Sequence, residues 1–348
     1  MPKYFDYIAK PKSAWLTVNR ACNFRCKWCY GQSTQFDIKD TMDVELAKKL
    51  VDCVAEAGVK RINFIGGEPT LWKDLFEIIT YCKENKITTG LITNGSRFSD
   101  PVFCDKYNNN PCDYIGVSVK SANENDFLKA TGVQMFRETT QGLKRIFAKY
   151  NAGFETVYNN VIGRKGLIEI AKYCHDLGAK NMTLSLCSSI IDGDGEINNR
   201  YLNIKNIAQD IQEIYSDICD IYNGNIQIEM FLPLCFFSDE FVNSLFEKNQ
   251  IVSICHVHDR DGVIFDTNGD ILPCNTMVGN HILRYPDDYN DGNSLIRSLN
   301  SKKLIDDYHY LLRYPSKVCT NCKWNQKCKG GCILNWVTLD PALCEARV

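Results

Sequence analysis

Three cysteines, Cys22, Cys26 and Cys29, follow an apolar run at residues 15–18 with the spacing C-x3-C-x2-C. Three thiolates on one short loop can hold three irons of a [4Fe–4S] cluster, whose usual complement is four cysteine ligands. No further cysteine follows before Cys53, so one iron is left open for another ligand. An open iron on a cluster that delivers single electrons is a reaction site. The alternatives are a zinc site or thiols scattered through a core.

A second motif, Gly66-Gly67-Glu68-Pro69, begins 37 residues after Cys29. Glycines let a backbone approach a ligand closely, Pro69 fixes the turn, and Glu68 adds charge. With the cysteine spacing, this motif resembles the radical S-adenosylmethionine (radical SAM) enzymes. The resemblance implies that the open iron chelates the amino and carboxylate groups of SAM. It also implies that an electron cleaves the sulfonium to give a 5′-deoxyadenosyl radical, which abstracts hydrogen from a substrate.

The same resemblance implies further contacts with SAM. The GGEP motif would grip the methionine amino group, and Trp28 would pack on adenine, although Trp28 could equally be a packing residue. Contacts with the ribose and carboxylate are expected at the ends of later strands, from residues that could also be ordinary turn residues: Thr93, Asn94, Ser118 and Asn160. Many relatives carry an aspartate shortly after the serine. This chain has Lys120 there instead, so we expect the local contact to differ.

Seven cysteines near the C-terminus form a second pattern, in which Gly-x4-Cys precedes C-x2-C-x5-C-x3-C. The pattern resembles the SPASM domain, which carries two auxiliary [4Fe–4S] clusters. By position, the resemblance implies that the distal cluster is held by Cys319, Cys322, Cys328 and Cys344. It implies that the cluster nearer the active site is held by Cys255, Cys274 and Cys332. A zinc ribbon is the alternative, but seven cysteines do not divide into sites of four.

The nearer auxiliary cluster therefore lacks a fourth cysteine. Its remaining ligand could be the substrate or one of these side chains: His256, His258, Asp259, Asp261 or Cys235. Cys187, at the end of the sixth predicted strand, and Cys235, in the apolar segment 231–237, are also candidate hydrogen-atom donors to a substrate radical. The alternative for each is a buried, inert thiol.

The elements that must position these residues alternate between strand-like and helix-like pieces from residue 14 to about 188. That alternation is typical of a parallel α/β sheet. The candidate strands are residues 15–18, 61–65, 89–93, 114–119, 155–161 and 182–187. Amphipathic helices are predicted at 44–54, with Thr41 as N-cap, at 71–84 and at 137–150. Six such units match the partial (β/α)6 barrel that the resemblance implies, with reactive loops at the carboxyl ends of the strands.

Beyond about residue 188 this regular alternation of strand-like and helix-like pieces ends. An isoleucine-lined helix is predicted at 204–221, and a β-hairpin at 262–272, because Asn268-Gly269 suits the positive φ angles of a tight turn. We therefore expect a radical SAM core at residues 1–220, a bridging segment at 221–254 and a SPASM region at 255–348.

Composition excludes several classes of function. The chain has 40 Lys and Arg against 42 Asp and Glu, a formal charge of −2, which gives no reason to expect nucleic acid or a membrane as a partner. The N-terminal residues lack the apolar core of a signal peptide. Eighteen cysteines without an export signal indicate metal ligation in the cytoplasm rather than disulfides.

The resemblance implies a maturase that abstracts hydrogen from a residue of a ribosomal precursor peptide and forms a crosslink, thioether or epimer. The roughly 14 residues before the first strand leave no room for a peptide-recognition domain, so a separate recognition protein is a possible partner. A flavodoxin or ferredoxin would supply electrons. The alternatives are a formylglycine-forming oxidase like the anaerobic sulfatase maturases and, from another class, a non-catalytic iron–sulfur scaffold or electron-transfer protein.

Overall fold

The computed structural model describes residues 8–31, 38–187, 189–191, 196–198, 200–201, 203–252, 255–311, 319 and 321–337. Six parallel strands form the middle of its sheet: β1 (Ser13–Thr17), β2 (Arg61–Ile65), β3 (Thr88–Thr93), β4 (Tyr114–Ser118), β5 (Ala152–Tyr158) and β6 (Met182–Leu186). They pair in chain order and overlap the six predicted strands. The predicted partial (β/α)6 barrel is therefore confirmed.

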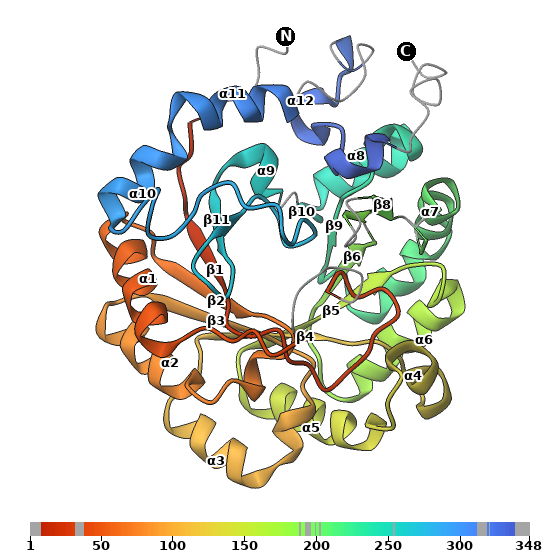
Figure 1. Cartoon of the computed structure of the whole chain (residues 1–348). Coiled ribbons are helices and arrows are strands. Elements are labelled where there is room, and N and C mark those ends of the chain that lie inside the picture. Colours follow the sequence, from red (N-terminus) through yellow and green to blue (C-terminus); the bar gives the residue numbers. More distant parts are fainter. Residues whose placement is uncertain are drawn as a thin grey trace.

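Helices connect these strands and cover the outer side of the curved sheet, as Figure 1 shows. They are α1 (Val44–Glu56), α2 (Leu75–Glu84), α3 (Pro101–Asn109), α4 (Glu124–Thr131), α5 (Phe136–Lys149) and α6 (Gly163–Asp176). The predicted N-cap Thr41 is wrong, because the side chain of Asp43 accepts hydrogen bonds from the N–H groups of Glu45 and Leu46. Helix α2 begins later than predicted because a separate 3-10 turn, Pro69–Leu71, precedes it.

The sheet continues beyond the six units at both edges. Strands β9 (Ile226–Glu229) and β10 (Ile251–Val252) extend it beside β6, and β11 (Gly262–Phe265) and β12 (Ile271–Leu272) extend it beside β1. The segments predicted as a bridge and a C-terminal region thus both add strands to the barrel sheet. The proposed divisions at residues 220 and 254 remain predictions.

The predicted β-hairpin is confirmed, because β11 and β12 pair antiparallel. Its turn differs from the expectation, since Gly269 has a φ of 86° whereas Asn268 has no positive φ. Strand β11 also pairs in parallel with β1. The hairpin therefore belongs to the barrel sheet rather than standing apart.

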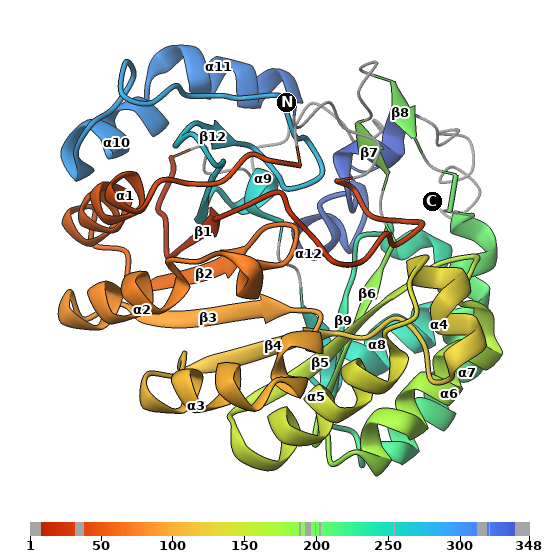
Figure 2. The ribbon, with the colours of Figure 1, turned by 60° about the horizontal axis from the view of Figure 1, so that its bottom comes forward.

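The remaining strands and α-helices lie outside the ten-stranded sheet and its six connecting helices. They are β7 (Ile190–Ile191), β8 (Ile197–Asn198), α7 (Ile204–Ile221), α8 (Asp239–Glu247), α9 (His256–Asp259), α10 (Gly292–Leu299), α11 (Lys302–Leu311) and α12 (Asn325–Cys328). Helix α7 matches the predicted isoleucine-lined helix. Helix α10 lies beside α1 (Figure 2), where the N–H of Gly292 donates to the Glu56 carboxylate at 2.9 Å.

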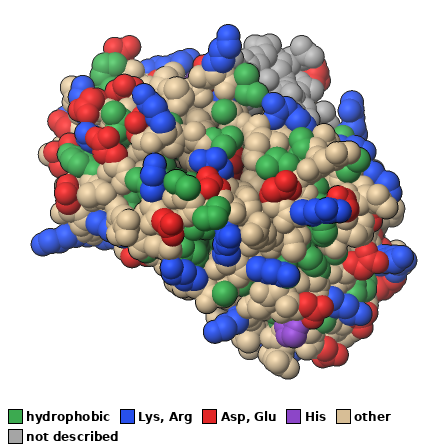
Figure 3. All heavy atoms as spheres, turned by 90° about the horizontal axis from the view of Figure 1, so that it is seen from below, with side chains coloured by type: hydrophobic (Ala, Val, Ile, Leu, Met, Phe, Trp, Pro, Cys, Tyr) green, Lys and Arg blue, Asp and Glu red, His purple; other side chains and the backbone are tan. Residues whose placement is uncertain are grey.

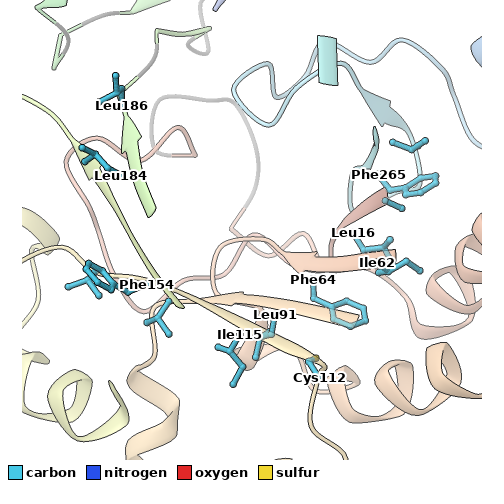
Figure 4. Close-up of a cluster of buried hydrophobic side chains, with 14 of the residues drawn as sticks. Leu16, Ile62, Phe64, Leu91, Cys112, Ile115, Phe154, Leu184, Leu186 and Phe265 are labelled. Atoms are coloured by element: carbon cyan, nitrogen blue, oxygen red, sulfur yellow. The ribbon is translucent and has the colours of Figure 1, made fainter. Parts of the chain in front are cut away.

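The two faces of the sheet differ because side chains alternate along each strand. One face carries buried apolar side chains (Figure 4): Leu16, Phe64, Leu91 and Ile115, which are paired in that order across the strands, and Phe154, which is paired with Val117. The opposite face, inside the curve of the sheet, carries polar residues toward the strand ends, including Ser118, which is paired with Glu155. Burial of the apolar face fixes the register and so determines which residues face the interior.

The described surface gives two further observations. No described helix is long and apolar enough to span a membrane. On the face shown in Figure 3, basic and acidic side chains are interspersed, and the hydrophobic side chains form small separate groups.

Candidate active site

The cysteine triad lies on the loop that leaves the carboxyl end of β1. Cys26 is buried, while Cys22 and Cys29 are half-buried. The loop is held in place by Phe24, whose ring packs edge-on against Phe127 with 5.3 Å between centroids, and by a bond from the Cys29 N–H to the Cys26 carbonyl at 3.0 Å. The three thiols are thus gathered on one anchored loop.

The electrostatics of the triad suit a cationic metal centre. Burial raises the pKa of Cys22 to about 12; the Phe24 N–H opposes this shift, and the negative charges of Glu68, Cys26 and Cys29 add to it. Burial also raises the pKa of Cys26, against the positive charge of Lys120. These thiols stay protonated at neutral pH unless a metal takes the place of the protons, which is how cysteine sites couple metal binding to deprotonation.

The two glycines of the GGEP motif are required by the triad loop itself. The Gly67 N–H donates to the Asn19 carbonyl at 2.9 Å, and the Glu68 N–H donates to the Ala21 carbonyl at 2.8 Å. A Cβ atom on Gly67 would lie 2.3 Å from the Ala21 oxygen, and one on Gly66 would lie 2.4 Å from the Asn19 oxygen. In this structure the backbone at Gly66 and Gly67 therefore lies against the loop that carries the cysteines.

Glu68 joins the ends of β2 and β3. Its side chain is only 1% exposed, and its Oε1 accepts from the hydroxyls of Thr70 and Thr93, both at 2.6 Å. Its Oε2 accepts from the Asn94 N–H at 2.7 Å. Burial raises the pKa of Glu68, while the hydrogen bonds from these threonines and Asn94 oppose that shift. The carboxylate thus acts as an internal anchor for two residues that the sequence predicted as SAM contacts.

A further bond connects this anchor to the cysteine loop. Nδ2 of Asn94 donates to the side-chain oxygen Oδ1 of Asn23 at 2.8 Å, and Nδ2 of Asn23 donates to the Ser96 hydroxyl at 2.9 Å. Asn23 stands between Cys22 and Cys26. The triad, the GGEP motif and the end of β3 therefore form one hydrogen-bonded unit.

The three other predicted SAM contacts differ in their exposure and hydrogen bonding. The indole Nε1 of Trp28 is buried and has no hydrogen-bond partner among the described residues. Ser118 is half-buried and accepts from Lys120 at 2.6 Å. Asn160 is exposed, whereas its neighbour Asn159 is buried and caps the following turn through the Val161 N–H at 2.8 Å.

Two carboxylates that the sequence analysis did not identify face the interior of the sheet. Glu155 on β5 and Glu229 on β9 both interact with Ser185 on β6, which is paired with Glu229. Burial and the charge of Glu155 raise the pKa of Glu229, and burial raises that of Glu155 against the positive charge of Lys120. Period-two alternation could have placed Glu155 on the same face as Ser118, but the pairing of β9 was not visible in the sequence.

The first group of C-terminal thiols contains Cys255, Cys274 and Cys332. Burial raises the pKa of Cys255, and the charges of Cys332 and Cys274 raise it further. Burial raises the pKa of the nearby Tyr308 to about 12. The positive charge of Arg260 opposes this shift, and the negative charges of Cys255 and Cys274 add to it. These three cysteines, predicted to share one cluster, therefore lie near one another.

The second group contains three predicted ligands and one unexpected member. Burial raises the pKa of Cys319 to about 12, and the nearby thiols Cys328, Cys235 and Cys322 add to the shift. Cys344, the predicted fourth ligand, lies outside the described residues. No group of three or more His, Cys, Asp or Glu side chains in the described part of the chain is arranged to hold a single metal ion. A [4Fe–4S] cluster makes a different demand, since each iron takes its own thiolate.

The side chains considered as a fourth ligand of the nearer cluster are mostly engaged elsewhere. Nε2 of His258 bonds to the Gly331 carbonyl at 2.9 Å, and Asp259 pairs with Lys329. Asp261 bonds to Nδ1 of His256 at 3.0 Å. Nε2 of His256 is buried without a hydrogen-bond partner among the described residues. A carboxylate on one ring nitrogen and an unpartnered second nitrogen are typical of histidine metal ligands.

The two predicted hydrogen donors lie in different settings. Cys187 is buried at the end of β6, its N–H donates to the Tyr158 carbonyl at 2.9 Å, and burial raises its pKa to about 12. It is therefore a neutral thiol, the form that can donate a hydrogen atom. Cys235 is half-buried in a 3-10 turn, Leu234–Phe236, beside the second group of thiols. Both donor roles stay predictions.

The chain is similar to known proteins over different parts of its length. The family model described as Radical SAM superfamily matches residues 16–177. The GTP 3′,8-cyclase of Photorhabdus laumondii is 27% identical over 188 residues, which are 52% of this chain and 55% of that protein. Alignments with the first curated relatives span only between 30% and 55% of their lengths.

Solved structures resemble nearly the whole chain. Streptococcus suis SuiB bound to the precursor peptide SuiA matches with a TM-score of 0.72 and 18% identity, over 97% of this chain and 76% of that one. The structure of anSMEcpe with bound AdoMet and Cp18Cys peptide matches with a TM-score of 0.69 and 18% identity, over 92% of this chain and 89% of that one. At this identity the likeness shows a shared fold.

Proposed function

We propose that this chain, whose residues 16–177 match the model of the Radical SAM superfamily, uses radical chemistry to modify a peptide. Cys22, Cys26 and Cys29 would hold a [4Fe–4S] cluster. Burial raises the pKa of Cys22 and Cys26, and metal binding would replace the protons of these two thiols. SAM and the cluster together supply a 5′-deoxyadenosyl radical. The observation that carries this assignment is the hydrogen-bonded unit that joins the triad loop, Glu68 and the end of β3.

The chain's own residues would position SAM and exclude water. The turn formed by Gly66, Gly67 and Pro69, which Glu68 holds rigid, would contact the methionine end of SAM. Trp28 offers a buried, unpartnered indole N–H beside the cysteines, which is a donor available to a ligand. The remaining proposed contacts are Thr93, Asn94, Ser118 and Asn160.

The C-terminal thiols would hold two auxiliary clusters. In this proposal Cys255, Cys274 and Cys332 hold the nearer one, with His256 or the substrate at its fourth position. Cys319, Cys322 and Cys328 hold three irons of the distal one, for which spacing predicted Cys344 as the fourth ligand. These clusters would accept the second electron of a two-electron oxidation or hold the substrate, and a neutral Cys187 could return a hydrogen atom.

A peptide substrate is supported by the fold shared with SuiB and anSMEcpe, whose structures hold peptides. Glu155 and Glu229, which lie near each other on the interior face of the sheet, would accept a proton or bind a cationic substrate group. A formylglycine-forming oxidation fits the likeness to anSMEcpe and remains an alternative within this class. An iron–sulfur scaffold without SAM cleavage is the alternative of another class.

A nucleotide substrate is the second candidate, favoured by the similarity to the GTP 3′,8-cyclase. The two are separated by giving the reconstituted, reduced enzyme SAM with either candidate precursor peptides or GTP. The peptide proposal expects 5′-deoxyadenosine in proportion to a mass change of the peptide, and none above background with GTP. Product formed from GTP, with no change in any peptide, would overturn it.

A further inference from the structure

The second group of C-terminal thiols includes Cys235, which is far in sequence from Cys319, Cys322 and Cys328. The stretch from Phe231 to Leu234 runs along the cysteine-rich segment, where the Cys332 N–H donates to the Phe231 carbonyl at 2.8 Å. A Cβ on Gly331 would lie 2.6 Å from the same carbonyl oxygen, so the two backbones touch. The segment that leads to Cys235 is therefore fixed against the cysteine-rich segment.

The residue before Cys235 makes a hydrogen bond to a cysteine of the second group. The Leu234 N–H donates to Sγ of Cys328 at 3.2 Å, and that bond lowers the pKa of Cys328 against the larger effect of burial. N–H donors on cysteine sulfurs are a recognised means by which proteins tune iron–sulfur clusters. Leu234 opens the 3-10 turn that carries Cys235, so the turn places Cys235 directly beside Cys328.

From this geometry we propose that Cys235 is the fourth ligand of the distal auxiliary cluster, together with Cys319, Cys322 and Cys328. The inference rests on the auxiliary clusters of the proposed function. It gives Cys235 a structural role in place of hydrogen donation, and it takes the ligand position from Cys344.

Electrostatic proximity supports the same grouping. Among the neighbouring thiols, Cys235 raises the pKa of Cys328 more than Cys322 does. Cys235 also raises the pKa of Cys319. Ligation forms one Fe–Sγ bond to Cys235 and releases its thiol proton to water, with no change of oxidation state. Four thiolates would then complete the cluster without a ligand from outside the protein.

The test is iron content and Mössbauer and EPR spectroscopy of the full-length, anaerobically reconstituted protein. We expect Cys235→Ala to lose about four irons per chain, or to leave a [3Fe–4S] cluster visible by EPR after oxidation. Cys344→Ala should keep the wild-type iron content and spectra. Cys53→Ala is the matched control, because it removes a buried thiol on α1 that belongs to none of the three groups of proposed cluster ligands.

Cys319→Ala separates this inference from the proposed function. If Cys319→Ala keeps all of its iron, the distal cluster itself is refuted, and the proposed function loses its auxiliary site. If Cys319→Ala loses about four irons while Cys235→Ala keeps the wild-type iron and spectra, only the assignment of Cys235 is overturned. Should Cys235→Ala fail to fold, Cys235→Ser decides. An altered EPR spectrum supports an oxygen ligand on iron, and an unchanged spectrum overturns the proposal.

Discussion

Substitution of Glu68 by glutamine tests whether its carboxylate anchors the site. The side chain is 1% exposed, and its oxygens accept from two hydroxyls and from backbone N–H groups. An amide has only one acceptor oxygen. If that oxygen takes the place of Oε1, it keeps the bonds to Thr70 and Thr93, and the NH2 group then faces the N–H of Asn94.

The cost can be worked out from these bonds. Loss of one hydrogen bond to a charged acceptor costs about 1.5–3 kcal/mol, and the bonds that remain weaken because they no longer involve a charge. Against this, a neutral amide is easier to bury than a carboxylate whose pKa burial raises. We expect Glu68→Gln to lower the free energy of unfolding by about 2–4 kcal/mol.

Urea unfolding of the full chain under anaerobic conditions measures this difference. Glu84→Gln, at an exposed position on α2, is the control and should change the unfolding free energy by less than about 0.5 kcal/mol. A double-mutant cycle with Thr93→Val should give a coupling of about 1 kcal/mol, because Glu68→Gln removes the charge from the hydrogen bond that Thr93→Val removes entirely. If Glu68→Gln is as stable as the control, the anchor role of Glu68 is wrong.

Three further predictions concern the loop, the carboxylate pair and the hairpin. In Gly67→Ala the new Cβ would lie 2.3 Å from the Ala21 oxygen, so we expect displacement of the triad loop and a measurable loss of reconstituted iron. Glu229 has a raised pKa of about 7; its contribution to stability is therefore present below pH 4.5 and lost as the pH rises through about 7, and Glu229→Gln should flatten that dependence in unfolding experiments. Asp266 forms a buried ion pair with Arg20 that joins the hairpin to the loop after β1, so Asp266→Asn should cost about 3 kcal/mol in thermal or urea unfolding. A cost below about 0.5 kcal/mol would contradict that link.

The chemistry-bearing motifs were predictable because they are local. Cys22, Cys26 and Cys29 lie on one loop, and the GGEP motif follows the next strand, so their spacing and the family resemblance were sufficient to bring them together. The function of Glu68 as an anchor was not predictable, because its partners at Thr93 and Asn94 come from another strand. The structure adds a second reason for the glycines, because they also accommodate the backbone of the triad loop; their contact with SAM stays a prediction.

Features that depend on pairing between distant strands were missed. Glu229 lies in a segment interpreted as a bridge, and only the register of β9 with β6 brings it to Ser185 and Glu155. Cys235 was considered a ligand of the nearer cluster or a hydrogen donor, but the contact of Leu234 with Cys328 places it with the distal thiols. Hydrophobic periodicity predicts elements, whereas the tertiary packing of the sheet sets these neighbours.

Formation of 5′-deoxyadenosine from SAM by the reconstituted, reduced protein tests the central claim most directly. The wild-type chain and Cys82→Ala, which removes a buried thiol on α2, should both produce it, and Cys26→Ala should produce none. Equal amounts from wild-type and Cys26→Ala, or none from a wild-type chain that holds its iron, would contradict the assignment of the triad as the SAM-cleaving site.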